Sequence, residues 1–346
     1  SKNQNSLNFL LAPISWIYGF VVWLRNLLYD DHILHSTKVS IPTICVGNLA
    51  VGGTGKTPMA EYLISLLSTN YKVALLSRGY GRKTKGFRIA NELDTAQTIG
   101  DEPMQIHTNF PDIPVAVCAD RVKGIKRLQQ LFPDLQCIIL DDAYQHRKLR
   151  CGFYVLLTPY DRLYTHDHML PWGRLRDLPN QSQRANVVVV TKCPTKMQPI
   201  ERRIVSNTLQ LASYQHLFYS SIGYKPIAIH HTPLLVTGIA NPKPLLEHLQ
   251  QQYPDTKLLA YPDHHVFTKQ DIEHLLHIAA QYECVVTTEK DYMRMQQTPL
   301  VEALGDKLHV LPIQTDLGID KEAFDRQILL YVSENNRKSS TVHYQL

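Results

Sequence analysis

The sequence predicts an α/β protein in which a mostly parallel β-sheet carries helices on both faces. Apolar, β-branched runs of strand length alternate with stretches of helical periodicity, an order typical of parallel sheets. The runs are apolar throughout, as expected of strands that are buried on both faces. With 346 residues, the chain can hold one large or two ordinary domains with a substantial core.

The expected strands are short apolar runs, and most of them stop at a polar or glycine-rich turn. They cover residues 39–46, 72–76, 113–118, 137–140, 153–157, 187–191, 234–236, 284–287 and 308–312. Residues 121–132 are an example of the amphipathic stretches between them, with Val122, Ile125 and Leu128 on one side. From residue 226 onward the alternation repeats, which indicates either a second α/β lobe or a continuation of the first sheet.

This pattern divides the chain into four predicted parts. Residues 1–35 form an N-terminal interfacial membrane helix, residues 36–225 a nucleotide-binding domain, and residues 226–332 a smaller C-terminal α/β lobe. Residues 333–346 are polar and are expected to form a flexible tail. The polar block at 161–184 is expected to be a long functional loop.

The N-terminal segment is strongly apolar, with no charged residue between Lys2 and Arg25. A signal peptide is disfavoured because no small-residue cleavage site follows. A helix over residues 13–28 would be roughly 24 Å long, which is short of the about 30 Å hydrocarbon core of a bilayer.

Polar and small residues recur at helical spacing in this segment, at Asn8, Ser15, Gly19 and Asn26. Two tryptophans lie on another face, and tryptophan favours the headgroup region of a membrane. The sequence therefore favours a helix that lies on one leaflet. A helix buried against the protein's own core and a short tilted span remain open as alternatives.

A glycine-rich run follows the first predicted strand and leads directly into a helix. Strand, glycine-rich loop, Gly-Lys-Thr and helix form the arrangement that holds a nucleoside triphosphate, because backbone N–H groups and the helix N-terminus face the phosphates. Lys56 can reach the β- and γ-phosphates, and Thr57 can ligate Mg²⁺. The predicted nucleotide-binding residues are Ala50, Val51, Gly52, Gly53, Thr54, Gly55, Lys56 and Thr57. Ala50 stands where the strict pattern has glycine.

Two carboxylates end the predicted strand at 137–140. Asp141 and Asp142 follow four apolar residues, and acids at a strand end beside a phosphate-binding loop can hold Mg²⁺. His146 lies four residues further on, where it could orient phosphate oxygens or relay a proton. A hydrated loop is the alternative for His146.

Further charged groups follow other predicted strands. The run Gly100-Asp101-Glu102-Pro103 places two carboxylates in a turn or at a helix start, and one of them could accept the proton of an attacking hydroxyl. Arg78 and Arg121 each follow a strand, and ligands of open α/β sheets bind beyond the carboxyl ends of the strands. Solvated charged loops are the alternative for each of these groups.

Composition bounds the class of protein. A net charge of +5 is modest and does not indicate a nucleic-acid binder. The six cysteines include no C-x-x-C pair and are predicted to be reduced and buried. The run Asp263-His264-His265 is a poor zinc site, because adjacent histidines do not chelate easily, but it could deliver a histidine to an active site.

Taken together, these motifs resemble the tetraacyldisaccharide 4′-kinase family, over nearly the whole chain. The resemblance is carried by Gly47-Asn48, the run from Gly52 to Pro58, Ser77-Arg78-Gly79-Tyr80-Gly81, Gly100-Asp101-Glu102-Pro103, Asp141-Asp142 with Gln145-His146-Arg147, Leu170-Pro171 with Gly173 and Leu175-Arg176, and Asp263-His264-His265. Departures from the family pattern are Ala143-Tyr144, Cys151, and Asp177 in place of glutamate.

The resemblance implies a kinase of lipid A biosynthesis that moves the γ-phosphate of ATP, with Mg²⁺, to the 4′-hydroxyl of a tetraacylated glucosamine disaccharide 1-phosphate. The implied catalytic residues are Asp101 as base, His264 as its partner, Asp142 and Lys56. The implied metal ligands are Thr57, Asp141 and Asp142. Glu102, Arg78, Arg121, His146 and Asp177 are the implied substrate contacts.

The resemblance also implies a peripheral or monotopic protein on the cytoplasmic face of the inner membrane of a Gram-negative bacterium. The sequence leaves the oligomeric state open. A P-loop GTPase or ATPase switch, or a metallochaperone at the membrane, is the alternative. Pro194 stands where guanine-specific loops carry a carboxylate, and Val51 stands where partitioning ATPases carry a lysine, so both alternatives lack a defining residue.

Overall fold

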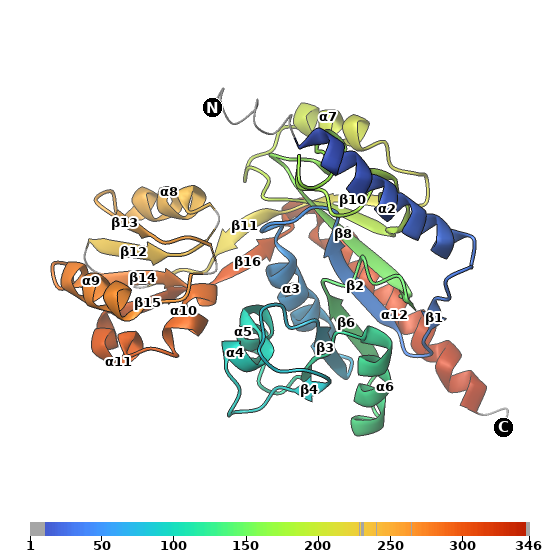
Figure 1. Ribbon diagram of the computed structural model, residues 1–346, viewed down its shortest axis with the longest axis horizontal. Helices are drawn as coiled ribbons and strands as arrows, with labels where there is room; N and C mark the ends of the chain where they lie inside the picture. The colour runs from blue at the N-terminus through green and yellow to red at the C-terminus, as the bar shows by residue number, and fades with distance from the viewer. Residues whose placement is uncertain (1–10, 228, 230–231, 240, 264, 344–346) are drawn as a thin grey trace.

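The computed structural model describes residues 11–227, 229, 232–239, 241–263 and 265–343. Its centre is an eight-stranded sheet in the order β10-β9-β8-β2-β6-β3-β5-β4, parallel except for β4 (Figure 1). The strands are β2 (Thr43–Asn48), β3 (Val73–Ser77), β4 (Arg88–Ile89), β5 (Val115–Val117), β6 (Cys137–Asp141), β8 (Phe153–Pro159), β9 (Val187–Thr191) and β10 (His216–Tyr219). The predicted parallel α/β sheet is confirmed.

Both faces of this sheet are buried, because consecutive side chains of each strand point to opposite sides. In β6, Ile138 and Leu140 belong to one core, whereas Cys137 and Ile139 belong to the other. The covering helices are α3 (Lys56–Ser68), α4 (Ala96–Ile99), α5 (Asp101–Asn109), α6 (Arg121–Leu131) and α7 (Pro199–Leu209). Because the parallel strands share a direction, the loops after β2, β3, β6 and β9 meet at one edge.

The segment that follows forms a second, separate sheet of four parallel strands in the order β13-β12-β14-β15. Its strands are β12 (Pro233–Thr237), β13 (Lys257–Ala260), β14 (Cys284–Thr288) and β15 (Leu308–Leu311), and its helices are α8 (Lys243–Gln252), α9 (Lys269–Ala279), α10 (Glu289–Met295) and α11 (Leu300–Leu304). An antiparallel ribbon of β11 (Ser221–Tyr224) and β16 (Ile313–Asp316) joins the two lobes (Figure 1).

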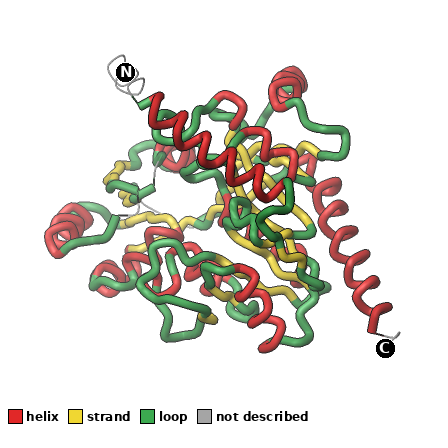
Figure 2. Tube along the Cα trace, turned by 45° about the vertical axis from the view of Figure 1, so that its right-hand side comes forward, coloured by secondary structure: helices red, strands yellow, loops and turns green. Residues whose placement is uncertain are grey.

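The end of the chain differs from the expected flexible tail. Helix α12 (Lys321–His343) continues through most of residues 333–346 and returns to the first lobe. Phe324, Ile328 and Val332 lie in the core beneath the large sheet, because their spacing of four residues aligns them on one face of the helix. Figure 2 shows α12 as a long helix on the outside of the molecule. The last helix therefore belongs to the first lobe by its packing, although 321–332 was predicted to be part of the second.

The N-terminal helix α2 (Ala12–Asp30) attaches to the first lobe through its polar face. Ser15 Oγ donates to the Met169 carbonyl at 2.6 Å, and Ser15 and Asn26 are both buried. The predicted polar stripe is thus the docking face, except that Asn8 lies outside the described residues. Within the described part of the chain, no helix has the length and hydropathy needed to cross a membrane.

Candidate active site

The predicted phosphate-binding loop lies between the end of β2 and the start of α3. Gly55, immediately before α3, has a φ of 87°, a left-handed conformation that favours glycine. Asn48 Nδ2 donates to Thr54 Oγ1 at 2.7 Å, and Thr191 Oγ1 at the end of β9 donates to the Thr54 carbonyl at 2.9 Å. These contacts hold the loop between the ends of β2 and β9, which have β8 between them in the sheet, so that it faces the edge where ligands of such sheets bind.

Two cations that were not predicted as site residues lie close to this loop. A Cβ built on Gly52 would lie 3.7 Å from an Arg174 guanidinium nitrogen, and one on Gly53 would lie 3.8 Å from Lys192 Nζ. Partial desolvation, followed by the positive charge of Arg174, lowers the pKa of Lys192, whereas Asp161 raises it. The sequence offered a weak signal for Lys192, because it directly follows a strand that ends beside the loop.

Asp142 sits next to the loop lysine. Its carboxylate lies 3.8 Å from Lys56 Nζ and accepts from both terminal nitrogens of Arg176, with one of these contacts at 3.1 Å. Burial opposes ionisation of Asp142, but the positive charges of Lys56 and Arg176 prevail and lower its pKa to about 2. Arg176 also bonds to Asn48 Oδ1 and so connects the long loop to the end of β2. The motif around Leu175-Arg176 was the signal that could have identified Arg176.

Asp141, at the end of β6, is a buried carboxylate with one oxygen that no described residue satisfies. It is 2% exposed, and its Oδ1 atom has no hydrogen-bond partner among the described residues. Desolvation, followed by the charges of Glu102 and Asp142, raises the pKa of Asp141 to about 7. A buried carboxylate oxygen without a donor is costly, and a bound cation would satisfy it.

Asp101 and Glu102 occupy the first turn of α5 and pair with helix α10 of the second lobe. Asp101 Oδ2 lies 2.9 Å from Arg294 Nε and 2.8 Å from Arg294 Nη2. Glu102 Oε1 lies 3.4 Å from Lys290 Nζ. Sequence reasoning did not identify Arg294, because no local pattern links it to residues 193 positions earlier.

Arg121, one of the predicted substrate contacts, is buried behind Asp142. It is 1% exposed, and its guanidinium donates to the carbonyls of Cys118, Ala119 and Asp142. Arg121 therefore supports the backbone of Asp142 from behind. Arg78 is exposed after β3, as expected of a group that meets a ligand.

His146 lies on the loop after Asp142. Desolvation, followed by the charge of Arg121, lowers the pKa of His146 to about 4, so the ring is neutral at pH 7. Its Nε2 atom has no hydrogen-bond partner among the described residues. A neutral imidazole with an unsatisfied nitrogen can donate or accept one hydrogen bond.

Asp177, one of the predicted substrate contacts, is buried against the N-terminal helix. It is 1% exposed and lies beneath α2, where its Oδ1 accepts from Asn26 Nδ2 at 2.8 Å. Arg184 Nη2 lies 3.7 Å from the other carboxylate oxygen. A desolvated carboxylate needs donors, and its Oδ1 atom finds them within the protein, in the Asn26 side chain and in the Leu178 backbone N–H at 3.0 Å. Asp177 thus anchors the N-terminal helix.

The structure describes one of the two adjacent histidines that follow β13. His264 lies outside the described residues. His265 Nε2 lies 3.0 Å from Asp271 Oδ2, and its ring stacks on Tyr261 at 4.8 Å. His265 therefore supports the start of α9.

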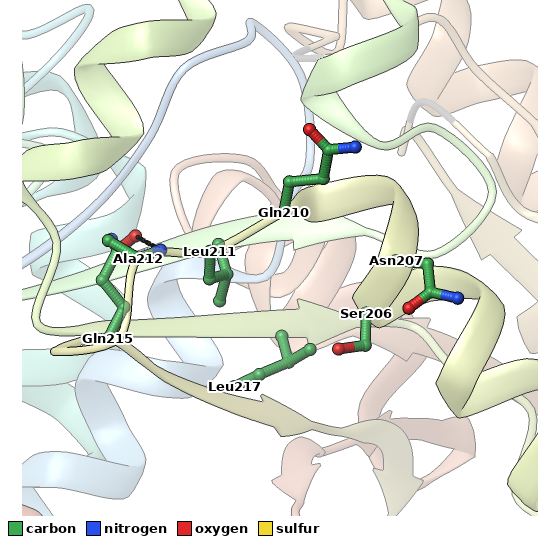
Figure 3. Close-up of a pocket in the computed structure, with 7 residues that line it drawn as sticks. All are labelled: Ser206, Asn207, Gln210, Leu211, Ala212, Gln215 and Leu217. Carbon is green, nitrogen blue, oxygen red and sulfur yellow. Dashed lines mark hydrogen bonds between the residues drawn. The ribbon is translucent and has the colours of Figure 1, made fainter.

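A separate groove of about 500 Å³ lies between the end of α7 and the start of β10 (Figure 3). Its lining residues are Ser206, Asn207, Gln210, Leu211, Ala212, Gln215 and Leu217. Because this is the amino end of β10, the groove lies opposite the edge that carries the phosphate-binding loop. It contains none of the predicted site residues.

Lys56, Asp141 and Asp142 lie together at one sheet edge, and phosphoryl transfer is a reaction that depends on positioning and charge neutralisation. The fold and this edge define the chain as an ATP-dependent P-loop kinase. The chain belongs to the tetraacyldisaccharide-1-P 4′-kinase family, whose model matches residues 7–333. The predicted family is confirmed.

Individual relatives agree with this assignment. A tetraacyldisaccharide 4′-kinase of Bacteroides thetaiotaomicron is 42% identical, with 95% of this chain and 94% of the relative covered. One of Flavobacterium johnsoniae is 43% identical, with 96% and 99% covered. The crystal structure of "apo" form LpxK from Aquifex aeolicus in complex with ATP matches with a TM-score of 0.73 and 25% identity, over 94% of this chain and 99% of that one.

Proposed function

We propose that this chain transfers the γ-phosphate of ATP to the 4′-hydroxyl of a tetraacylated glucosamine disaccharide 1-phosphate, a step of lipid A biosynthesis. The observation that carries the proposal is the grouping of Lys56 with Asp141 and Asp142 at the carboxyl edge of the sheet, in a chain of the 4′-kinase family. Lys56 neutralises the phosphates, while the backbone of the loop and the start of α3 bind their oxygens.

Thr57, Asp141 and Asp142 are the residues that would hold Mg²⁺. The unsatisfied Oδ1 of Asp141 fits this role, and Asp142 stays ionised beside Lys56. When bound, Mg²⁺ neutralises charge on the β- and γ-phosphates. The arrangement of Arg176 on Asp142 and Asn48 keeps the metal-binding carboxylate and the loop in one rigid group.

Asp101 is the proposed base, with His264 as its partner. The 4′-oxygen forms a bond to the γ-phosphorus as the bond from that phosphorus to the bridging oxygen breaks, and the electron pair leaves with ADP. The proton of the hydroxyl passes to the Asp101 carboxylate, directly or through the histidine, and then to water. The pairing of His265 with Asp271 supports the choice of His264, because it engages the neighbouring ring elsewhere.

Helix α2 is the proposed membrane contact, on the cytoplasmic face of the inner membrane. Its polar residues face the protein, which leaves its large apolar side chains exposed. These are Ile14, Trp16, Ile17, Phe20, Val21, Trp23, Leu24 and Leu27. A row of apolar residues with two tryptophans fits a helix embedded in the interface of one leaflet. A lipid acceptor explains why a nucleotide-binding fold carries such a surface.

The experiment that tests the proposed function offers γ-labelled ATP to the purified protein in mixed micelles. The micelles contain tetraacyldisaccharide 1-phosphate, or the same lipid already carrying a 4′-phosphate as a blocked control. Label is expected on the first lipid alone, and GTP is expected to be a poorer donor. A protein that binds ATP but leaves no label on the unblocked lipid would contradict the proposal.

A further inference from the structure

We propose that the second lobe positions the base of the first, with Arg294 on α10 holding the Asp101 carboxylate in its reactive orientation. This inference rests on the proposed function, in which Asp101 accepts the proton. It adds Arg294 as a positioning residue, since its side chain acts through Asp101.

The contact between these residues is close and shielded from water. Both Nε and Nη2 of Arg294 lie within 2.9 Å of the same oxygen, Asp101 Oδ2. The Arg294 side chain is 7% exposed and that of Asp101 is 21% exposed. Two donors on one oxygen restrict both rotation of the carboxylate and its distance from the guanidinium.

Arg294 is itself held by the sheet of the second lobe. Its Nη1 lies 3.0 Å from Asp291 Oδ1 and 3.4 Å from the Gly238 carbonyl. Asp291 is 1% exposed and accepts from Thr237 Oγ1 at 2.6 Å and from Thr288 Oγ1 at 2.8 Å. These two threonines end β12 and β14, so Arg294 is tied to two strand ends.

The start of α5 is constrained from the other side by the first lobe. Gly100 has a φ of 99°, and a Cβ there would lie 2.9 Å from the Tyr80 carbonyl, so the backbone before Asp101 passes close to the loop after β3. Glu102 makes a parallel contact with Lys290, one helical turn before Arg294. The first lobe therefore fixes the backbone position of Asp101, and the second lobe fixes the orientation of its side chain.

The chemical consequence concerns the charge and the angle of the base. A neighbouring guanidinium favours the ionised carboxylate, which is the form that can accept a proton. Small misplacements of a reacting group reduce the rate strongly. Loss of Arg294 is therefore expected to make the ionised form of Asp101 less favourable and to disorder its side chain, while ATP binding at the phosphate-binding loop persists.

The test compares full-length Arg294→Gln with wild type and with Arg202→Gln as a matched control. Arg202 forms a two-pronged pair with Asp320, at 3.0 and 3.1 Å, beside Tyr219 at the end of β10. Arg294→Gln is expected to reduce kcat roughly ten- to a hundredfold, with the KM for ATP unchanged within about twofold. In the plot of kcat against pH, the acid limb, where kcat falls at low pH, is expected to lie at higher pH in Arg294→Gln than in wild type. Arg202→Gln is expected to change neither kcat nor the limb.

Repeating the Arg294→Gln change in the Asp101→Ala variant separates this inference from the proposed function. In Asp101→Ala, the change Arg294→Gln is expected to have no further effect on kcat, because the two residues act as one unit. An equal further loss in that background, or wild-type kcat and pH limb in Arg294→Gln alone, would overturn the role of Arg294. Full turnover by Asp101→Ala alone would instead overturn the assignment of the base.

If Arg294→Gln does not fold, Arg294→Lys is used in its place. Lysine keeps the charge but cannot contact Asp101, Asp291 and Gly238 with the same fork. A kcat at least about threefold below wild type, with an unmoved acid limb, supports positioning by the guanidinium. A wild-type kcat in this variant overturns it.

Discussion

The side-chain amide of Asn26 donates to the buried carboxylate of Asp177 at 2.8 Å, across 151 positions of the chain. This hydrogen bond attaches the polar face of α2 to the loop that also carries Arg176. It explains how a helix with a mostly apolar surface keeps that surface outward: its few polar groups have partners inside the protein. Because this contact depends on one side chain, the docking of α2 can be tested by replacing Asn26.

Replacing Asn26 with leucine is expected to destabilise the protein by about 1–3 kcal/mol, because Asp177 keeps its buried oxygen but loses a donor. Urea unfolding at neutral pH measures this change. Asn207→Leu, on the exposed side of α7, is the control and is expected to lie within about 0.5 kcal/mol of wild type. Equal stability of Asn26→Leu and wild type would show that the hydrogen bond does not hold α2.

Changing the exposed face of α2 is expected to weaken membrane binding without loss of stability. Trp16 is 70% exposed and Phe20 is 60% exposed, so neither contributes much to the core. The double variant Trp16→Ser with Phe20→Ser is expected to bind phospholipid vesicles at least about tenfold more weakly, since each side chain buried in lipid is worth about 1.5–3 kcal/mol.

Cosedimentation with vesicles of phosphatidylethanolamine and phosphatidylglycerol measures this binding. Ile319→Ser is the control, because Ile319 is 85% exposed and lies outside α2. Unchanged vesicle binding by the double variant would remove α2 as the membrane contact.

Replacing Asp101 with alanine is expected to lower turnover by on the order of 10²-fold or more, the usual scale for a general base. ATP affinity is expected to persist, because the phosphate-binding loop lies on β2 and α3 and not on α5. Isothermal titration with a non-hydrolysable ATP analogue and the lipid phosphorylation assay separate the two effects. Asp306→Ala, on an exposed turn of the second lobe, serves as the control. Wild-type turnover would place the base on another residue.

Glu61 predicts a pH dependence of stability at the junction between the lobes. Desolvation, followed by the charge of Glu289, raises the pKa of Glu61 to about 7, although Asn109 and Gln105 donate to it and oppose the shift. A carboxyl whose pKa is higher in the folded state binds more protons when folded. Its stabilisation is therefore present at low pH and is lost as the pH rises through about 7.

The variant Glu61→Gln removes this titration but keeps a similar shape. We expect the decline in unfolding free energy between pH 5 and 8 to become shallower by on the order of 1 kcal/mol. Urea unfolding at several pH values measures the slope. Glu302→Gln, at an exposed position of α11, is expected to leave the slope unchanged. A slope in Glu61→Gln equal to that of wild type would contradict the raised pKa.

Local patterns were sufficient for the elements that bind nucleotide. The strand at Val187–Thr191 has the bounds predicted from its valine run, and the strand ending in Asp141 lies beside the phosphate-binding loop as its acidic end indicated. Burial on both faces and the left-handed glycine of the loop are properties of short segments, so the residues themselves reveal them. The family resemblance rested on the same segments.

Partners that are distant in the chain could not be predicted in this way. Asp177 accepts a hydrogen bond from Asn26, and Arg121 supports the backbone of Asp142 from within the core. Helix α12 packs against the large sheet of the first lobe, although the whole second lobe lies between them in the sequence. A charged residue has similar sequence surroundings whether its partner is a ligand or another part of the chain.

The sequence by itself thus determined the class of fold, the nucleotide loop and the carboxylates at the strand ends, because backbone periodicity and loop conformation are local. Only the tertiary structure determined which face of α2 points outward. It also determined that Arg294 forms an ion pair with Asp101. Both contacts form because packing of the lobes and the terminal helices removes water from their interfaces. The polar groups buried there must then find hydrogen-bond partners within the protein.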